Sequence, residues 1–271
     1  MRTSMMLPAA MYFIAVSAGA QTAEELVAKN IEAHGGLAAM KAITSYRAEG
    51  RYQIQGITAQ LRADAKNNDH LLMAVTVQGM TQTQAYDGNV GWQISPFSGR
   101  KDAERLGEDD LRDITESADF YGPLVDYKEK GNRVEFLGHD TVDGDDALKL
   151  KVTLKNGDIV NYFLDPDTFL EIRMEKQQFI RGSVKETVTN LGSYKKVNGV
   201  YYPFSSEQGP RNDPSQIVQV TFTSIAANVP LDDAEFRMPA SAAVPSSQKH
   251  AEPPGNEKAP EVPKTAEVPK Q

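Results

Sequence analysis

A two-residue alternation of apolar and polar side chains begins at Tyr46 and returns along most of the chain that follows. In residues 46–54, Tyr46, Tyr52 and Ile54 share one face, whereas Arg47 and Arg51 share the other. Because successive side chains of a strand point to opposite faces, the pattern predicts a half-buried β-strand. Turn-forming pairs separate the alternating segments, namely Asp87-Gly88, Asp143-Gly144, Asn156-Gly157, Asp165-Pro166 and Asn198-Gly199. The sequence therefore predicts a large antiparallel meander.

The segment before this alternation has the spacing of helices. Thr22 and Glu25 form the pattern of a capping box, and Gly35-Gly36 is a typical helix end. A second, shorter helical segment is predicted over residues 37–43, where apolar residues recur every three positions. The amino-terminal part of the domain is therefore helical.

The two-residue period fails once more between residues 102 and 127. Leu111, Ile114 and Ala118 recur there at helical spacing, and Phe120, Tyr121 and Leu124 follow them. A sheet with one apolar face has to cover that face or close on itself. We therefore expect a mainly β, α+β domain in which a strongly bent sheet has helices across its open side.

The amino terminus has the organisation of an export signal. Arg2 supplies a positive charge, residues 5–16 are almost wholly apolar, and Ala18-Gly19-Ala20 fits the A-x-A cleavage pattern. This apolar run is shorter than the roughly 20 residues that a spanning helix needs. We expect a signal peptide over residues 1–20, cleavage after Ala20, and a periplasmic protein. The chain has no cysteine, which removes disulfides and a lipid-modified cysteine, so no permanent membrane anchor is expected.

The carboxyl-terminal residues differ in composition from the rest. Residues 241–271 are rich in proline, glutamate and lysine, and the sequence EVPK at Glu261–Lys264 recurs at Glu267–Lys270. So few apolar side chains do not offset the entropy lost on ordering. The sequence predicts a disordered tail over 241–271 and a folded domain over 21–240.

The chain carries few signatures of chemistry. Its net charge of -8 argues against a nucleic-acid partner. It has no G-x-S-x-G elbow, no cysteine nucleophile and no glycine-rich phosphate loop. Its four histidines lack metal-ligand spacing, and we interpret His34 as a charge that favours a helix carboxyl terminus. We therefore predict no enzyme, no cofactor and no metal. A hydrolase is the contrary hypothesis, and it predicts a cavity with titratable groups of shifted pKa.

The segment Tyr86–Phe97, YDGNVGWQISPF, resembles the LolA/LolB superfamily of lipoprotein carriers and outer-membrane lipoprotein-sorting proteins. The match lies in the turn Asp87-Gly88, in Trp92 and in the pair Pro96-Phe97. The sequence FRMP at Phe236–Pro239 is similar to the closing segment of that superfamily. The resemblance implies an incomplete antiparallel barrel of about eleven strands with a helical lid. It also implies that the cavity holds acyl chains.

Aromatic and aliphatic residues spread along the strands and the middle helix are the candidates for lining such a cavity. They are Tyr46, Tyr52, Ile54, Leu61, Trp92, Phe97, Leu111, Ile114, Phe120 and Tyr121. The resemblance also implies an arginine of the early strands that holds the lid closed. Arg47, Arg51 and Arg62 are the candidates for this contact.

These observations predict a periplasmic carrier that binds the acyl chains of lipoproteins, or other lipids, for sorting to the outer membrane. Its expected partners are an inner-membrane donor and an outer-membrane receptor. The alternative is an envelope sensor, an interaction module of the same fold that binds a membrane regulator or a lipid signal. In either case the apolar ligand site would lie between the curved sheet and the helices.

Overall fold

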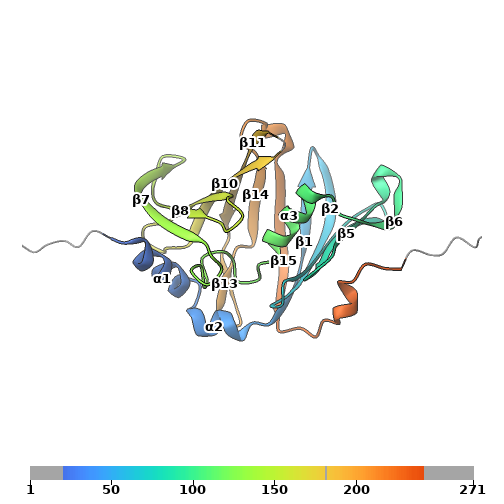
Figure 1. Ribbon diagram of the computed structural model, residues 1–271, viewed down its shortest axis with the longest axis horizontal. Helices are drawn as coiled ribbons and strands as arrows, with labels where there is room; N and C mark the ends of the chain where they lie inside the picture. The colour runs from blue at the N-terminus through green and yellow to red at the C-terminus, as the bar shows by residue number, and fades with distance from the viewer. Residues whose placement is uncertain (1–20, 181, 241–271) are drawn as a thin grey trace, which may run out of the picture. The chain divides into compact units, whose positions relative to one another are not determined.

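The computed structural model describes residues 21–180 and 182–240, which form α-helices, short 3-10 helices and a large antiparallel sheet (Figure 1). The signal peptide predicted over residues 1–20 and the tail predicted over 241–271 lie outside the described residues. All elements below belong to the segment for which a folded domain is predicted.

Helix α1 (Ala23–Ala33) begins where the sequence predicts. The Thr22 hydroxyl accepts a hydrogen bond from the Glu25 amide, and the Glu25 carboxylate accepts one from the Thr22 amide, which confirms the capping box. The chain leaves the helix through Gly35, whose φ is 118°. A side chain here would place its Cβ 2.2 Å from the carbonyl oxygen of Gly199, so this position requires glycine. Helix α2 (Leu37–Ala42) follows at once, and α3 (Glu108–Ser117) comes from mid-chain.

Thirteen strands in the described residues form one antiparallel sheet. They are β1 (Ser45–Ile54), β2 (Ile57–Lys66), β3 (His70–Val77), β4 (Met80–Asp87), β5 (Gly91–Ser95), β6 (Arg100–Arg105), β7 (Arg133–Val142), β8 (Asp145–Thr153), β9 (Ile159–Leu164), β10 (Glu171–Ile180), β11 (Ser183–Gly192), β14 (Ser205–Pro210) and β15 (Val218–Ala227). A separate hairpin pairs β12 (Lys195–Val197) with β13 (Val200–Tyr202). Three 3-10 helices complete the described elements, η1 (Pro96–Ser98), η2 (Pro214–Gln216) and η3 (Asp233–Glu235).

The strand order is β6-β5-β4-β3-β2-β1-β15-β14-β11-β10-β9-β8-β7, so most neighbours in the sheet are neighbours in sequence. The predicted meander is therefore confirmed. Strand β15, the last strand in the sequence, pairs with β1, the first, and Ala227 lies opposite Tyr46. The edge strands β6 and β7 do not pair with each other within the described part of the chain, so the sheet stays open.

The expected count of about eleven strands is too low for this sheet of thirteen. One strand that the sequence did not predict is β6, which has the sequence RKDAER and lies at the start of the segment where the alternation fails. Five of its six residues are charged, and an edge strand tolerates them because few of its side chains need burial. The chain from Val200 to Glu207 divides between β13 and β14.

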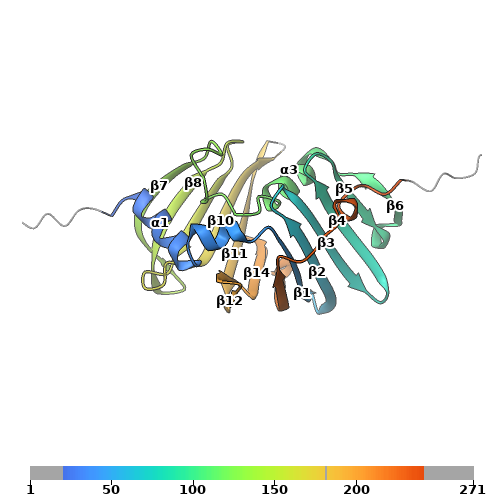
Figure 2. The ribbon, with the colours of Figure 1, turned by 90° about the horizontal axis from the view of Figure 1, so that it is seen from below.

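The helices cover one face of the sheet, which we call the inner face. Helix α1 packs on β8 and β9, where Leu26 and Val27 contact a core that includes Leu148, Leu150 and Leu164. Figures 1 and 2 place α1 toward the end of the sheet that contains β7, and α3 toward the end that contains β6. The two ends of the inner face therefore have separate cores.

Helix α3 packs on the inner face of β2–β5. Ile114 is buried against Ala65 and Leu71, with Leu111 beside them. Gly91 lies directly under this helix, because a Cβ at Gly91 would come within 2.7 Å of the Leu111 side chain. The missing side chain at this position lets the helix approach the sheet closely.

The outer face of the same strands is covered by the last described segment. Leu231 and Phe236 pack there against Leu72, Ala85 and Trp92. The Trp92 indole nitrogen donates a hydrogen bond of 2.7 Å to the carbonyl oxygen of Phe236. The end of the domain is thus held by burial on the face opposite to the helices.

Candidate functional site

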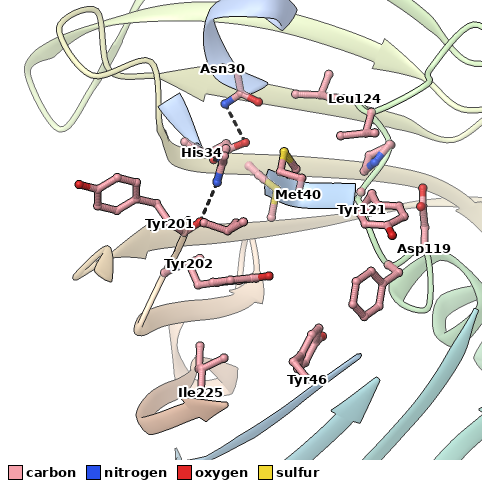
Figure 3. Close-up of a pocket in the computed structure, with 18 of the residues that line it drawn as sticks. Asn30, His34, Met40, Tyr46, Asp119, Tyr121, Leu124, Tyr201, Tyr202 and Ile225 are labelled. Atoms are coloured by element: carbon pink, nitrogen blue, oxygen red, sulfur yellow. Dashed lines mark hydrogen bonds and ion pairs between the residues drawn. The ribbon is translucent and has the colours of Figure 1, made fainter. Parts of the chain in front are cut away.

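A cavity of about 460 Å³ lies between the inner face of the sheet and a cover formed by α1, α2 and residues 119–125 (Figure 3). Ala48 of β1 and Ala63 of β2 form part of its sheet wall, where they are cross-strand partners. Met40 of α2 and Leu124 come from the cover. Small alanines on the sheet leave room that larger residues would fill, so the cavity follows directly from the sequence of these two strands.

Aromatic rings form much of the cavity wall. The Tyr46 ring lies 5.4 Å from the Phe120 ring and 6.3 Å from the Tyr202 ring, measured between centroids. Phe120 meets Tyr121 edge-on at 5.0 Å, and the Tyr121 hydroxyl donates to the carbonyl oxygen of Ile43 at 3.1 Å. These contacts bring together β1, β13 and the segment after α3, and they present a largely apolar surface to a ligand.

A buried polar cluster lies at one side of the cavity. His34 Nε2 is 2.8 Å from Glu171 Oε2, and His34 Nδ1 is 2.8 Å from the carbonyl oxygen of Tyr201. Glu171 also accepts hydrogen bonds from the Asn30 amide at 3.0 Å and from the Tyr194 hydroxyl at 3.1 Å. Because both ring nitrogens of His34 face acceptors, both must carry protons, and the pair is ionic. The cluster ties α1 to β10 and β13.

The pair shifts both of its pKa values. Burial alone would lower the pKa of His34, but the hydrogen bond to Glu171 and the charge of Glu171 outweigh it and raise that pKa above 6.5. Burial alone would raise the pKa of Glu171, but the hydrogen bond and charge of His34 outweigh it and hold that pKa below 4.5. Both groups are therefore charged at slightly acid pH.

A pH dependence of stability follows from these two directions. The raised pKa of His34 contributes fully below pH 6.5, and its contribution is lost as the pH rises through that raised pKa. The lowered pKa of Glu171 contributes above pH 4.5, and its contribution is lost as the pH falls through that lowered pKa. We expect the pair to stabilise the fold most between pH 4.5 and 6.5.

Urea unfolding at a series of pH values measures this effect. The His34→Gln variant should lack the part of the decline above pH 6.5 that the wild type shows. The exposed His139 offers a matched control, since His139→Gln should keep the wild-type profile. If His34→Gln and the wild type had parallel profiles above pH 6.5, the ionic description of the pair would be wrong.

The cluster also bears on the hydrolase hypothesis, which predicts titratable groups of shifted pKa in the cavity. His34 and Glu171 meet that part of the prediction. A catalytic histidine also needs a ring nitrogen that can exchange a proton with the substrate. Both nitrogens of His34 donate within the protein. The observed geometry is that of a structural ion pair.

Within the part of the chain that the structure describes, no group of three or more His, Asp or Glu side chains is placed to hold a metal ion. No helix in residues 21–180 and 182–240 is long and apolar enough to cross a membrane.

A second apolar space, which we call the groove, lies on the inner face farther along the same strands. Its volume is about 460 Å³, and its lining includes Tyr52, Ile54, Met73, Val75 and Phe97. It belongs to the same face as the cavity because Tyr52 and Tyr46 are six residues apart on β1. Phe97 is 45% exposed, so the groove opens to solvent.

Helix α3 is held from two sides. Its apolar side packs on β2–β5, and its polar side reaches residues of the β8–β11 region. Arg112 pairs with the buried Asp158 in the turn before β9. The Lys176 ammonium on β10 lies 3.2 Å from Asp113 and 2.5 Å from Glu116. We call these five residues the α3 latch, because they hold the helix across the inner face.

Breaking the latch should loosen α3. The Asp158→Asn variant removes the charge that faces Arg112, and we expect a loss of about 2 kcal/mol in the free energy of unfolding. Amide exchange in α3 should also become faster, because opening this helix then costs less. Asp167→Asn is the control, since Asp167 is exposed in the next turn and should change the stability by less than about 0.5 kcal/mol. Wild-type stability and wild-type exchange in Asp158→Asn would contradict the latch.

This fold is similar to that of several solved structures. No family model matches the chain, and no curated protein matches it. Among solved structures, a LolA superfamily protein from Nitrosomonas europaea matches 80% of this chain and 98% of its own, with a TM-score of 0.54 and 13% identity. The fold is LolA-like. A putative outer membrane lipoprotein-sorting protein domain from Vibrio parahaemolyticus covers 78% and 94%, with a TM-score of 0.53 and 11% identity. A DUF1329 family protein from Desulfovibrio piger covers 79% and 97%, with a TM-score of 0.53 and 14% identity.

The LolA-like fold divides the predicted lining residues among several places. Tyr46, Phe120 and Tyr121 line the cavity. Tyr52, Ile54 and Phe97 line the groove. Leu111 and Ile114 belong to the core under α3, and Leu61 is buried on the inner face of β2.

Trp92 lies in neither place, so its assignment to the lining is wrong. Tyr86 pairs with Gly91 and Ala85 with Trp92, so Trp92 shares the outer face with Ala85. Its ring is 3% exposed under Phe236. The aromatic character of Trp92 indicated burial, but only the register of β5 decides on which face.

The three candidate lid arginines also lie on the outer face. Arg47 Nε donates to Asp64 Oδ1 at 2.6 Å, and Arg62 Nε donates to Asp64 Oδ2 at 2.8 Å. Arg62 also reaches Glu235 at 3.1 Å, in the closing segment. Arg51 follows Arg47 at even spacing on β1 and therefore shares its face. Arg47 and Arg62 bind the carboxyl-terminal segment, and the arginine of the α3 latch is Arg112 on the helix itself.

The cavity is also lined by four residues that the sequence pattern did not predict, His34, Glu171, Tyr162 and Tyr202. His34 lies at the carboxyl-terminal end of α1, as predicted. Its ring, however, pairs with Glu171 of β10. A glutamate in an otherwise alternating strand was the one available signal for this pair. Nothing in the local sequence indicates which distant residue it meets.

Proposed function

We propose that the protein is a periplasmic carrier that binds acyl chains of lipoproteins or other lipids in the cavity, without catalysing a reaction. The aromatic and aliphatic cavity under α1, α2 and residues 119–125 is the observation that carries this proposal. The lipoprotein-sorting neighbour of the same fold supports the ligand class. An inner-membrane donor and an outer-membrane receptor would supply and receive the cargo.

The energetics suit reversible binding. Each methylene group transferred from water contributes about 0.8 kcal/mol. Burial of ten methylene groups would therefore contribute about 8 kcal/mol, which corresponds to a dissociation constant of about 1 μM before the costs of ordering. A cavity that binds by burial alone holds its ligand until a partner offers a larger apolar surface. Such mass action needs no catalytic group.

Displacement of an apolar fluorescent dye tests the proposal. Purified protein should bind the dye, and a diacylated lipopeptide should displace it at micromolar concentration. The same peptide without acyl chains is the control and should leave the dye bound. A lipopeptide that displaces no dye, together with purified protein from which no lipid can be extracted, would refute the carrier function.

A further inference from the structure

Three tyrosine hydroxyls open on the cavity without a hydrogen-bond partner in the described part of the chain. They belong to Tyr46 on β1, Tyr162 on β9 and Tyr202 on β13. The three residues come from three different strands, and much of the cavity around them is aromatic or aliphatic. A phenolic hydroxyl both donates and accepts, so each of these groups is a hydrogen-bonding position offered to a ligand.

Two other tyrosines near the cavity have hydroxyls that are bonded within the protein. The Tyr121 hydroxyl donates to the carbonyl oxygen of Ile43 at 3.1 Å. The Tyr194 hydroxyl donates to the carbonyl oxygen of Glu171 at 2.8 Å. The hydroxyls of Tyr121 and Tyr194 are thus bonded within the protein. The hydroxyls of Tyr46, Tyr162 and Tyr202 have no such partner among the described residues.

Tyr162 is the most buried of the three tyrosines, with only 5% of the residue exposed. Among the described residues, only Arg112 Nε is a side-chain polar atom that is both fully buried and without a hydrogen-bond partner. The Tyr162 hydroxyl is therefore not sealed in the core, and the open space that it reaches is the cavity that its side chain lines. A buried hydroxyl without a partner is costly, which makes this position suited to a polar ligand atom.

Tyr202 and Tyr46 lie together on another wall, 6.3 Å apart between ring centroids. Figure 3 shows the Tyr202 side chain pointing into the space toward Tyr46, whereas its neighbour Tyr201 points away. Burial raises the pKa of Tyr202 to about 12. The Tyr202 hydroxyl therefore keeps its proton at neutral pH and is available as a donor.

We propose that Tyr46, Tyr162 and Tyr202 donate hydrogen bonds to carbonyl oxygens of the bound lipid, so that the cavity prefers acyl esters to hydrocarbon chains without carbonyl groups. This specificity rests on the proposed function, since it concerns the same cavity. A plain hydrocarbon would cover the three hydroxyls without pairing them, and that cost would lower its affinity. Ester carbonyls would pair them while the acyl chains contact the aromatic walls.

Matched lipids test this specificity through displacement of the dye. Dipalmitoylglycerol carries two ester carbonyls, and dihexadecylglycerol has the same chain length with ether links that lack them. We expect the wild type to bind the ester about tenfold more tightly. Each of Tyr46→Phe, Tyr162→Phe and Tyr202→Phe should weaken ester binding about two- to tenfold. None of them should weaken ether binding, because each removes a hydroxyl that the ether covers without pairing. The triple variant should lose the preference.

Tyr201→Phe is the matched control. Tyr201 borders the cavity and its carbonyl oxygen, which the variant keeps, faces His34, but its ring points away from Tyr46 and lies under Lys196. It should bind both lipids as the wild type does. Urea unfolding gives a second readout, since Tyr162→Phe removes a hydroxyl that has no partner and should not lower the midpoint.

The outcomes separate this inference from the proposed function. Equal binding of ester and ether by the wild type would overturn the inference and leave the carrier function standing. A preference that survives in the triple variant would also overturn it, because other groups would then read the carbonyls. Binding of neither lipid would overturn the carrier function and the inference with it.

Discussion

Replacing Phe236 by alanine is expected to lower the free energy of unfolding by about 3–5 kcal/mol. Phe236 is completely buried on the outer face, where its ring meets His70 edge-on at 5.1 Å. Its carbonyl oxygen accepts the hydrogen bond from the Trp92 indole. Truncation removes the apolar contact and leaves a cavity between the closing segment and β3–β5, and both terms destabilise.

Thermal and urea unfolding measure this effect, and a loss of that size should lower the melting temperature by about 10 °C. Phe179→Ala is the matched control, because Phe179 is 67% exposed at the β10–β11 hairpin and should change the stability by less than about 0.5 kcal/mol. Similar stabilities of the two variants would mean that the closing segment contributes nothing to the fold.

The Ala63→Trp variant is expected to lose lipid affinity by about a hundredfold. Ala63 is a small residue of the sheet wall, and an indole at this position would occupy part of the 460 Å³ cavity. Exclusion of three or four methylene groups from the cavity removes about 3 kcal/mol of binding free energy. Displacement of the dye by the diacylated lipopeptide measures the change.

Two further variants make that result interpretable. Ala48→Phe alters the cross-strand partner of Ala63 and should weaken binding in the same direction. Ala38→Phe adds a ring on the exposed surface of α2 and should keep wild-type affinity. Wild-type affinity in a folded Ala63→Trp variant would place the lipid elsewhere, with the groove as the next site to examine.

The sequence was sufficient for those features that depend on local periodicity. The alternation from Tyr46 to Ile54 placed tyrosines and arginines on opposite faces of β1, and the structure confirms that division. The capping box at Thr22 predicted the start of α1 to the residue. Both signals need only a few neighbouring positions, so the chain carries them whatever the rest of the fold does.

Features that depend on register or on distant pairing were not predictable in this way. Trp92 was assigned to the lining by its residue type, although its pairing in β5 turns it outward. His34 and Glu171 are separated by 137 residues, and only the packing of α1 on the sheet brings them together. The lid contact was assigned to arginines of β1 and β2, whereas the structure places Arg112 of α3 in the latch. In all three cases the contact can be predicted only when the fold is already known.

A lipid with a photoreactive group near the end of its acyl chain gives the most direct test of where the ligand binds. After irradiation, peptides that carry the cross-link are identified by mass spectrometry, with unlabelled lipid as competitor. The cavity predicts competed cross-links in residues 119–125 and in the strands that carry Tyr46 and Tyr202. Cross-links confined to the exposed Phe179 hairpin or to Leu137, and unchanged by competitor, would contradict a lipid-binding cavity.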